Sequence, residues 1–343
     1  MSEARHLLVA NPTAQSGKNA ARIERARALL DGLDVAHAFA ATAPAGGTVD
    51  IVARALDGGA FHTAIYMGGD GTFAEVAKGI LKSRRAGDVR LAMLPTGTAN
   101  DQGKSFGLDA DEEALERNVR VIAAGAEARL DVGRLRALAD DGTLVREDLF
   151  FDSAGWGISP RVLALRNEDR KAIAEVPVLR DLWRDQLVYA GALLRTFLSS
   201  YVDDDKFDAR VVADGETVEW SGLSDLILKG TPVYGGAWIF DRRARPDDGK
   251  FEVVPFQGKR DWISKAIVHL DQSGAVAESL ASLGVRHSEN LSARRISIDL
   301  TEHPGGLPIL AQIDGEEFPS TPRAEIEVLE RALRIVVPEE HAR

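Results

Sequence analysis

The chain contains a glycine-rich turn, Gly68-Gly69-Asp70-Gly71-Thr72, between two segments of different periodicity. A run of apolar, β-forming residues precedes it at 63–67, and apolar residues at helical spacing follow it at 73–81. Such a turn gathers backbone N–H groups at the start of a helix, where glycine lets an anion approach the main chain. The pattern indicates a phosphate site, although a single turn of this kind is more often an ordinary strand-to-helix connection.

Two further strand–loop–helix patterns favour the phosphate interpretation. A strand at 89–93 leads into the loop 94–101, and a strand at 6–10 leads into a polar loop and a helix at 20–30. Loops that follow neighbouring parallel strands lie along one edge of the sheet, where α/β proteins bind ligands. Lys18, Thr72 and Thr98 would supply a positive charge and hydroxyl groups, so we expect a bound nucleotide.

Six blocks of sequence resemble the diacylglycerol kinase catalytic domain family, which includes bacterial lipid kinases and sphingosine and ceramide kinases. In the family's order, the blocks are residues 11–18, 68–76, 95–101, 155–157, 246–251 and 313–316. The resemblance runs from about residue 6 to residue 337. It implies an N-terminal Rossmann-like parallel α/β domain, of the NAD-kinase and phosphofructokinase type. A β-sandwich domain would follow, with the active cleft between the two.

The same resemblance implies ATP as the nucleotide. The residues at the family's nucleotide-contacting positions are Asn11, Pro12, Thr13, Ser16, Gly17, Thr42, Gly69, Asp70, Gly71, Thr72, Glu75 and Thr98. Asp70 could also hold Mg²⁺ or water around the phosphates. Its alternative role is that of the polar residue in a tight turn.

Asp314 stands in the block Ile313-Asp314-Gly315-Glu316, which matches the family's catalytic Asp-Gly-Glu. Taken alone, Asp-Gly is a common hairpin turn, and this half of the chain contains three other such pairs. An attacking alcohol needs a nearby carboxylate, because its own pKa lies far above neutrality. The resemblance therefore implies Asp314 as the general base, with Glu316 as a group that orients or supports it.

Some members of the family hold a structural Mg²⁺ at the block that corresponds to residues 246–250. Carried over by position, the ligands would be the carboxylate of Asp248 and the backbone carbonyls of Arg245 and Lys250. Fewer than six protein ligands would leave room for water, which Mg²⁺ prefers to keep. The alternative interpretation of this block is a simple turn.

The chain has 343 residues, a formal net charge of −11 and no cysteine. The lack of cysteine excludes disulfides, thiolate zinc sites and cysteine nucleophiles, and it fits a reducing cytoplasm. The negative net charge argues against nucleic acid as a partner.

No segment approaches the roughly 20 apolar residues that span a bilayer, and the N-terminus lacks the apolar core of a signal peptide. We expect a soluble, cytoplasmic protein that makes transient peripheral contact with the membrane. The sequence leaves a homodimer open.

Strand and helix alternate over residues 1–126, and short strands with Asp-Gly turns dominate 127–324. The expected strands are 128–135, 144–151, 209–213, 217–220, 225–229, 251–256, 295–300 and 310–313. The family resemblance implies that a last strand, 332–337, returns to complete the first domain within 325–343. Helical insertions are expected near 160–201 and 261–283. The first carries an apolar face that would dock on the sandwich or guard a lipid slot at the membrane.

Together these features predict an ATP-dependent lipid kinase that transfers the γ-phosphate to a hydroxyl of a diacylglycerol-like, sphingoid or ceramide lipid. One alternative is a small-molecule kinase of the NAD-kinase type, which shares the Gly-Gly-Asp-Gly-Thr turn. Another is a regulatory protein of the same fold that binds lipid without catalysis. The late Asp-Gly-Glu block favours the lipid kinase, and the presence of both Asp70 and Asp314 argues against a protein without catalysis.

Overall fold

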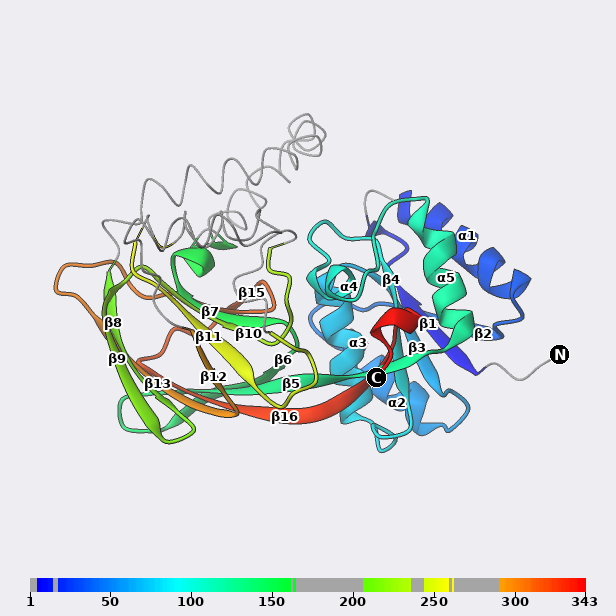
Figure 1. Ribbon diagram of the computed structural model, residues 1–343. Coiled ribbons are helices and arrows are strands. Elements are labelled where there is room, and N and C mark those ends of the chain that lie inside the picture. The colour runs from blue at the N-terminus through cyan, green and yellow to red at the C-terminus, as the bar shows by residue number, and fades with distance from the viewer. Residues whose placement is uncertain are drawn as a thin grey trace, which may run out of the picture.

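The computed structural model describes residues 5–14, 18–161, 163–164, 206–235, 244–258, 261 and 290–343. Ser16, Gly17 and most of the two expected helical insertions lie outside these residues. The described chain forms an α/β part and a β-rich part, which lie side by side (Figure 1). No helix within the described ranges is both long and apolar enough to cross a membrane.

The α/β part is a parallel sheet covered by helices on both faces. Its strands, in the order β2-β1-β3-β4, are β1 (His6–Ala10), β2 (His37–Ala41), β3 (Thr63–Gly68) and β4 (Arg90–Pro95). Its helices are α1 (Lys18–Gly32), α2 (Gly47–Asp57), α3 (Asp70–Lys82), α4 (Asp101–Ser105) and α5 (Ala114–Ala124). Successive side chains of β1 and β3 pack alternately with α1 and α5 or with α2 and α3. Such a sheet, buried on both faces, explains the continuous apolar runs in these strands.

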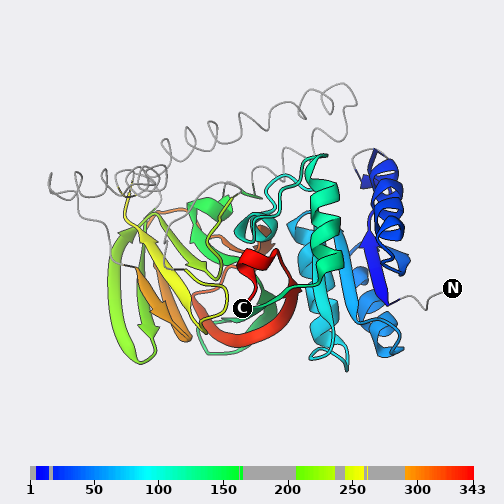
Figure 2. The ribbon, with the colours of Figure 1, turned by 45° about the vertical axis from the view of Figure 1, so that its right-hand side comes forward.

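One sheet continues from the α/β part into the β-rich part. The long strand β16 (Arg323–Val336) pairs in parallel with β4 at Arg334 and Ile335, and antiparallel with β5 (Glu127–Leu138) along most of its length. β16 curves from the β-rich part toward the parallel strands (Figures 1 and 2). The rest of this sheet consists of β6 (Leu144–Phe150), β8 (Phe207–Ala213), β9 (Glu216–Leu223) and β13 (Arg295–Glu302).

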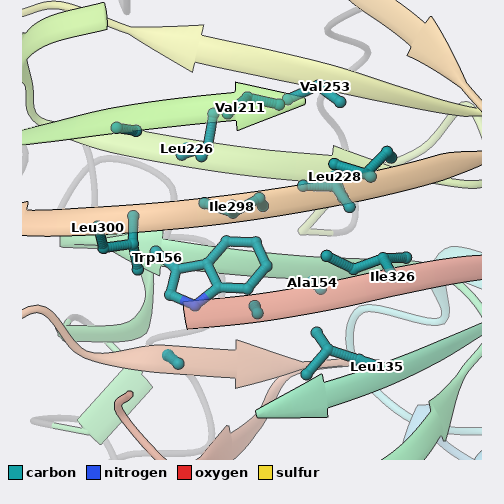
Figure 3. Close-up of a cluster of buried hydrophobic side chains, with 14 of the residues drawn as sticks. Leu135, Ala154, Trp156, Val211, Leu226, Leu228, Val253, Ile298, Leu300 and Ile326 are labelled. Carbon is teal, nitrogen blue, oxygen red and sulfur yellow. The ribbon is translucent and has the colours of Figure 1, made fainter. Parts of the chain in front are cut away.

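A second, antiparallel sheet packs on the β-rich end of the first. Its strands, in spatial order, are β12 (Leu291–Ala293), β11 (Phe251–Phe256), β10 (Asp225–Lys229), β7 (Ser153–Gly157), β14 (Ala311–Ile313) and β15 (Glu316–Phe318). Trp156 and Leu228 of this sheet share one buried cluster with Val211, Ile298 and Ile326 of the first sheet (Figure 3). Two sheets that enclose an apolar core form a sandwich. The expected fold class, a parallel α/β domain followed by a β-sandwich, is confirmed.

Asp-Gly pairs form two of the hairpin turns in the β-rich part. Asp214-Gly215 joins β8 to β9, and Asp314-Gly315 joins β14 to β15. Both residues of each pair have positive φ, 49° and 94° in the first turn and 47° and 76° in the second. Tight hairpins favour this left-handed conformation, which aspartate tolerates and glycine adopts without strain. The turn therefore places Asp314 at the end of a short hairpin.

Candidate active site

The loops expected to hold phosphate lie at one edge of the parallel sheet. The strand register places Ala10 beside Ala41 and Met67, and it places Gly68 beside Pro95. The loops that leave these strands therefore begin at neighbouring points. This is the sheet edge at which parallel α/β proteins bind ligands.

The first loop is folded around the side chain of Asn11. Its Oδ1 accepts hydrogen bonds from the backbone N–H of Thr13 over 3.0 Å and from the Thr13 hydroxyl over 2.8 Å. Pro12 lies between these two residues, and the Asn19 side chain donates to the Asn11 carbonyl over 2.7 Å. The N–H of Thr42, which follows β2, donates to the Ala10 carbonyl over 3.0 Å. Thr42 therefore lies next to this loop.

The second and third loops pack against each other through glycine backbone. A Cβ atom on Gly97 would lie 2.5 Å from the Cα of Gly69 and 2.9 Å from Oδ1 of Asn100. The N–H of Thr96 donates to the Gly68 carbonyl over 2.7 Å, and Thr98 is exposed at the tip of the third loop. Gly69 and Gly97 are therefore needed for this close approach of the two loops. Thr72 and Glu75, in the first turns of α3, are half-buried.

Asp70 is the first residue of α3, and its carboxylate faces the start of α4. Oδ2 accepts a hydrogen bond from the N–H of Asn100 over 2.9 Å, whereas the buried Oδ1 has no hydrogen-bond partner in the described structure. Burial raises the pKa of Asp70, and the charge of Asp152 raises it further. The N–H groups of residues 100–102 oppose both effects. A buried carboxylate oxygen without a partner is costly, and it suits a hard cation or a ligand hydroxyl.

The carboxylate of Asp314 lies beneath the loop 151–153. Its Oδ1 accepts from the N–H groups of Asp152 and Ser153 over 2.8 and 3.1 Å, and its Oδ2 accepts from the N–H of Phe151 over 2.9 Å. Burial raises the pKa of Asp314 to about 7, and the charge of Asp152 adds to this effect. The three N–H groups act in the opposite direction. A carboxylate that titrates near neutral pH suits a general base, because it can take up and release a proton there.

The hairpin that carries Asp314 reaches the glycine-rich turn of the α/β part. Oε1 of Glu316 lies 3.6 Å from the point where a Cβ atom on Gly71 would lie. Near this contact, the rings of Phe73 and Phe151 meet edge to face with centroids 5.6 Å apart, and the side chain of Gln102 donates to the Phe151 carbonyl over 2.7 Å. The structure therefore brings Asp70, Gly71, Asp314 and Glu316 together from the two parts of the chain.

Sequence reasoning missed a buried ion pair beside these carboxylates. Asp152 accepts a hydrogen bond from Nζ of Lys229 over 2.6 Å and a second from the Thr231 hydroxyl. The charge of Asp152 acts on both Asp70 and Asp314, so the three carboxylates lie close together. The only sequence signal was a lysine at the end of the apolar run 226–228.

The residues of the expected metal sites lie within the described ranges. No group of three or more His, Cys, Asp or Glu side chains in the described ranges is arranged to hold a metal ion. Arg245, Asp248 and Lys250 are exposed, and the N–H of Lys250 donates to Oδ1 of Asp248 over 3.1 Å. Asp131, which the sequence reasoning missed, accepts from the N–H of Gly249 over 2.6 Å. Burial raises the pKa of Asp131 to about 6. A structural Mg²⁺ at this block stays a prediction.

Two surface hollows lie away from the candidate active site. One, of about 520 Å³, lies over the antiparallel strands and includes the ion pairs of Arg134 with Glu327 and of Arg136 with Glu325. The other, of about 410 Å³, lies at the opposite ends of the parallel strands, beside His6. Neither is lined by a residue of the expected active site. The active cleft between the two parts stays a prediction.

Comparison with known proteins shows what this fold and this group of residues are similar to. Residues 5–135 match the diacylglycerol kinase catalytic domain. The expected resemblance to this family is therefore confirmed over the N-terminal part of the chain.

Sequence relatives carry corresponding names. A probable lipid kinase YegS-like of Pseudomonas aeruginosa (strain UCBPP-PA14) is 27% identical over 258 residues, which cover 74% of each chain. A probable lipid kinase YegS of Salmonella heidelberg (strain SL476) is 33% identical over 111 residues, 32% of this chain and 33% of that protein.

Solved structures share the fold over nearly the whole chain. A diacylglycerol kinase from Bacillus anthracis str. Sterne superposes with a TM-score of 0.70 at 18% identity and covers 99% of both chains. Yeast NADH kinase complexed with NADH superposes with a TM-score of 0.54 at 11% identity, over 98% of this chain and 84% of that one. At these identities the structural likeness establishes the fold.

Proposed function

We propose that this protein is an ATP-dependent lipid kinase that phosphorylates a hydroxyl of a diacylglycerol-like, sphingoid or ceramide lipid. One observation carries the proposal. A carboxylate with a pKa of about 7, Asp314, lies on a hairpin whose Glu316 reaches Gly71 in the glycine-rich turn. A base for an alcohol and a turn suited to phosphate are therefore adjacent. The family match and the names of the relatives support the same activity.

The proposed reaction assigns proton transfer to Asp314. As the lipid oxygen forms a bond to the γ-phosphorus of ATP, its proton passes to the Asp314 carboxylate. The bond between that phosphorus and the β,γ-bridging oxygen breaks, and ADP leaves. The N–H groups of residues 151–153 hold the carboxylate in one orientation. Positioning of this kind provides most of the rate in phosphoryl transfer.

We assign ATP binding to the loops at the edge of the parallel sheet. The backbone at the start of α3 offers N–H groups to phosphate, and Thr98 is exposed nearby. Asn11, Thr13 and Thr42 lie on the neighbouring loops. Ser16 and Gly17 belong to the same proposed site but lie outside the described residues.

Asp70 fits a role in holding Mg²⁺. Its buried Oδ1 has no hydrogen-bond partner in the described structure, and Mg²⁺ is commonly held by one or two carboxylates together with substrate phosphates and water. When bound there, the ion would neutralise charge on the phosphates. For a second, structural Mg²⁺, Asp248 and the carbonyls of Arg245 and Lys250 remain the proposed ligands.

A lipid substrate requires contact with a membrane. We therefore propose a cytoplasmic protein that meets its substrate by transient peripheral contact at the membrane surface. The expected apolar helices near 160–201, which would make that contact or guard a lipid slot, lie outside the described residues.

An NAD-kinase-type activity is the second candidate, because the fold of yeast NADH kinase covers 98% of this chain. The deciding experiment offers γ-labelled ATP and Mg²⁺ to the protein with diacylglycerol, sphingosine or ceramide in mixed micelles, and separately with NAD and NADH. We expect label in at least one lipid and none in the dinucleotides. Label in NAD or NADH alone would support the second candidate. No transfer to any acceptor would favour a protein that binds lipid without catalysis.

A further inference from the structure

Lys229 is a charged residue enclosed at the end of β10. Its side chain is 3% exposed, and Nζ donates to Oδ1 of Asp152 over 2.6 Å and to the carbonyl of Val233 over 2.7 Å. Nζ also lies 5.3 Å from the centre of the Tyr234 ring. An ammonium group is costly to bury unless it is paired and hydrogen-bonded. Lys229 therefore has one well-defined position.

On one side, Lys229 holds the loop that binds the proposed base. Asp152, its ion-pair partner, is the central residue of the loop 151–153, and its N–H donates to Asp314 over 2.8 Å. The hydroxyl of Thr231 also donates to the Asp152 carboxylate. In the pairing of β10 with β7, Lys229 is the register partner of Ser153, another donor to Asp314. The side chain and the strand of Lys229 thus fix the same loop.

On the other side, Lys229 holds a segment that contacts α4. The N–H of Val233 donates to the Ser105 hydroxyl over 3.2 Å, and the N–H of Gly235 donates to Oδ2 of Asp101 over 2.7 Å. The N–H groups at the start of α4 in turn bind the carboxylate of Asp70. A continuous path of contacts therefore runs from Asp70 through α4, residues 233–235, Lys229 and Asp152 to Asp314.

We propose that Lys229 is a positioning residue for phosphoryl transfer, which aligns Asp314 with Asp70 through the side chain of Asp152 and the carbonyl of Val233. The inference rests on the proposed function. The competing explanation is that the ion pair serves stability alone. In that case, activity would follow the stability of each variant.

A second ion pair provides a matched control. Nζ of Lys78, on α3, lies 2.6 Å from Oδ1 of Asp148, on β6, with the two side chains 23% and 20% exposed. This pair also joins the α/β part to the β-rich part and has the same length. Neither partner donates a hydrogen bond to Asp314.

The test compares Lys229→Met, the double variant Lys229→Met/Asp152→Asn, and Lys78→Met. The single variant leaves the Asp152 carboxylate buried without its cation, so its Tm should fall. The double variant removes that charge and should recover Tm. We expect both Lys229 variants to lose roughly 10²-fold in kcat, the size expected for a small misplacement of a catalytic group. Their KM for ATP should stay within about twofold of wild type. Lys78→Met should keep wild-type kcat.

Recovery of kcat together with Tm in the double variant would overturn the proposal, because activity would then follow stability. If the single variant does not fold, the double variant alone decides between the two explanations.

Amide hydrogen exchange gives a measurement that does not depend on activity. Exchange at residues 151–153 should be faster in the double variant than in wild type, with exchange in β3 unchanged. Equal exchange at 151–153 would contradict the proposal. If wild type phosphorylates none of the offered acceptors, the proposed function fails, and exchange still decides whether Lys229 holds this loop.

Discussion

The backbone N–H of Asp152 donates to the carboxylate of Asp314 over 2.8 Å, while the Asp152 carboxylate raises the pKa of Asp314. One residue thus orients the proposed base and also disfavours its ionisation. Burial is the larger cause of the raised pKa, and the combined result is a value of about 7. A base with this pKa is partly ionised at neutral pH and remains basic enough to accept a proton.

The rate of phosphoryl transfer should therefore depend on pH near neutrality. Only the ionised Asp314 can accept the proton of the lipid hydroxyl, so kcat/KM for the lipid should rise with pH and level off above about 7. A profile measured from about pH 5.5 to 8.5 with saturating ATP would show this rise. A flat profile over that range would contradict the assignment of Asp314 as the base.

Asp152→Asn should move this profile to lower pH. The substitution removes a negative charge beside Asp314, so the pKa of Asp314 should fall and the rate should level off at a lower pH. Asp141→Asn, in the exposed turn before β6, is the control and should leave the profile in place. A shift of the Asp152→Asn profile to higher pH would show that its charge does not act on the base as described.

Gly97→Ala should disturb the packing of the two glycine loops. Its Cβ would lie 2.5 Å from the Cα of Gly69, so the backbone must move. We expect a loss of about 1–3 kcal/mol in the free energy of unfolding, measured in urea. Gly87→Ala is the matched control, because a Cβ there meets no atom within 4 Å. It should change stability by less than about 0.5 kcal/mol. Equal stabilities of the two variants would argue against the close loop contact.

Gly71→Val should abolish ATP binding without unfolding the protein. Gly71 has no positive φ, and a Cβ there would lie 3.6 Å from Oε1 of Glu316, an ordinary contact. The branched side chain would instead occupy the space proposed for phosphate. ATP at about 100 times its Kd stabilises a protein by roughly 2.7 kcal/mol, so it should raise the Tm of wild type. An unchanged ATP-induced shift in the folded variant would place the nucleotide elsewhere.

The sequence indicated the α/β part well because its signals are local. A buried strand, a glycine-bearing loop and a helix follow one another within about 20 residues. The pairing of β16 with β4 joins residues far apart in the chain, such as Arg334 and Arg90. Composition and periodicity carry no signal for such a contact, and only the family resemblance suggested it.

In the candidate site, too, the sequence revealed the residues that stand in local motifs and missed those whose role depends on contacts between distant segments. Asp70 and Asp314 were found because each stands in a recognisable glycine-containing motif. Asp152 and Lys229 lie in ordinary apolar strands and loops, where a charged residue is usually taken as an exposed strand end. Their burial and pairing depend on how two sheets and the segment 231–235 come together, which a sequence pattern does not reveal.

The most direct test of a lipid kinase with Asp314 as its base measures transfer of label from γ-labelled ATP to lipid by wild type and by Asp314→Asn. The asparagine keeps the size of the side chain but cannot accept the proton, so kcat should fall by about 10²–10⁴-fold. The ATP-induced rise in Tm should persist, because Asp314 is not among the residues proposed to bind ATP. Transfer to lipid by Asp314→Asn at the wild-type rate would contradict the account.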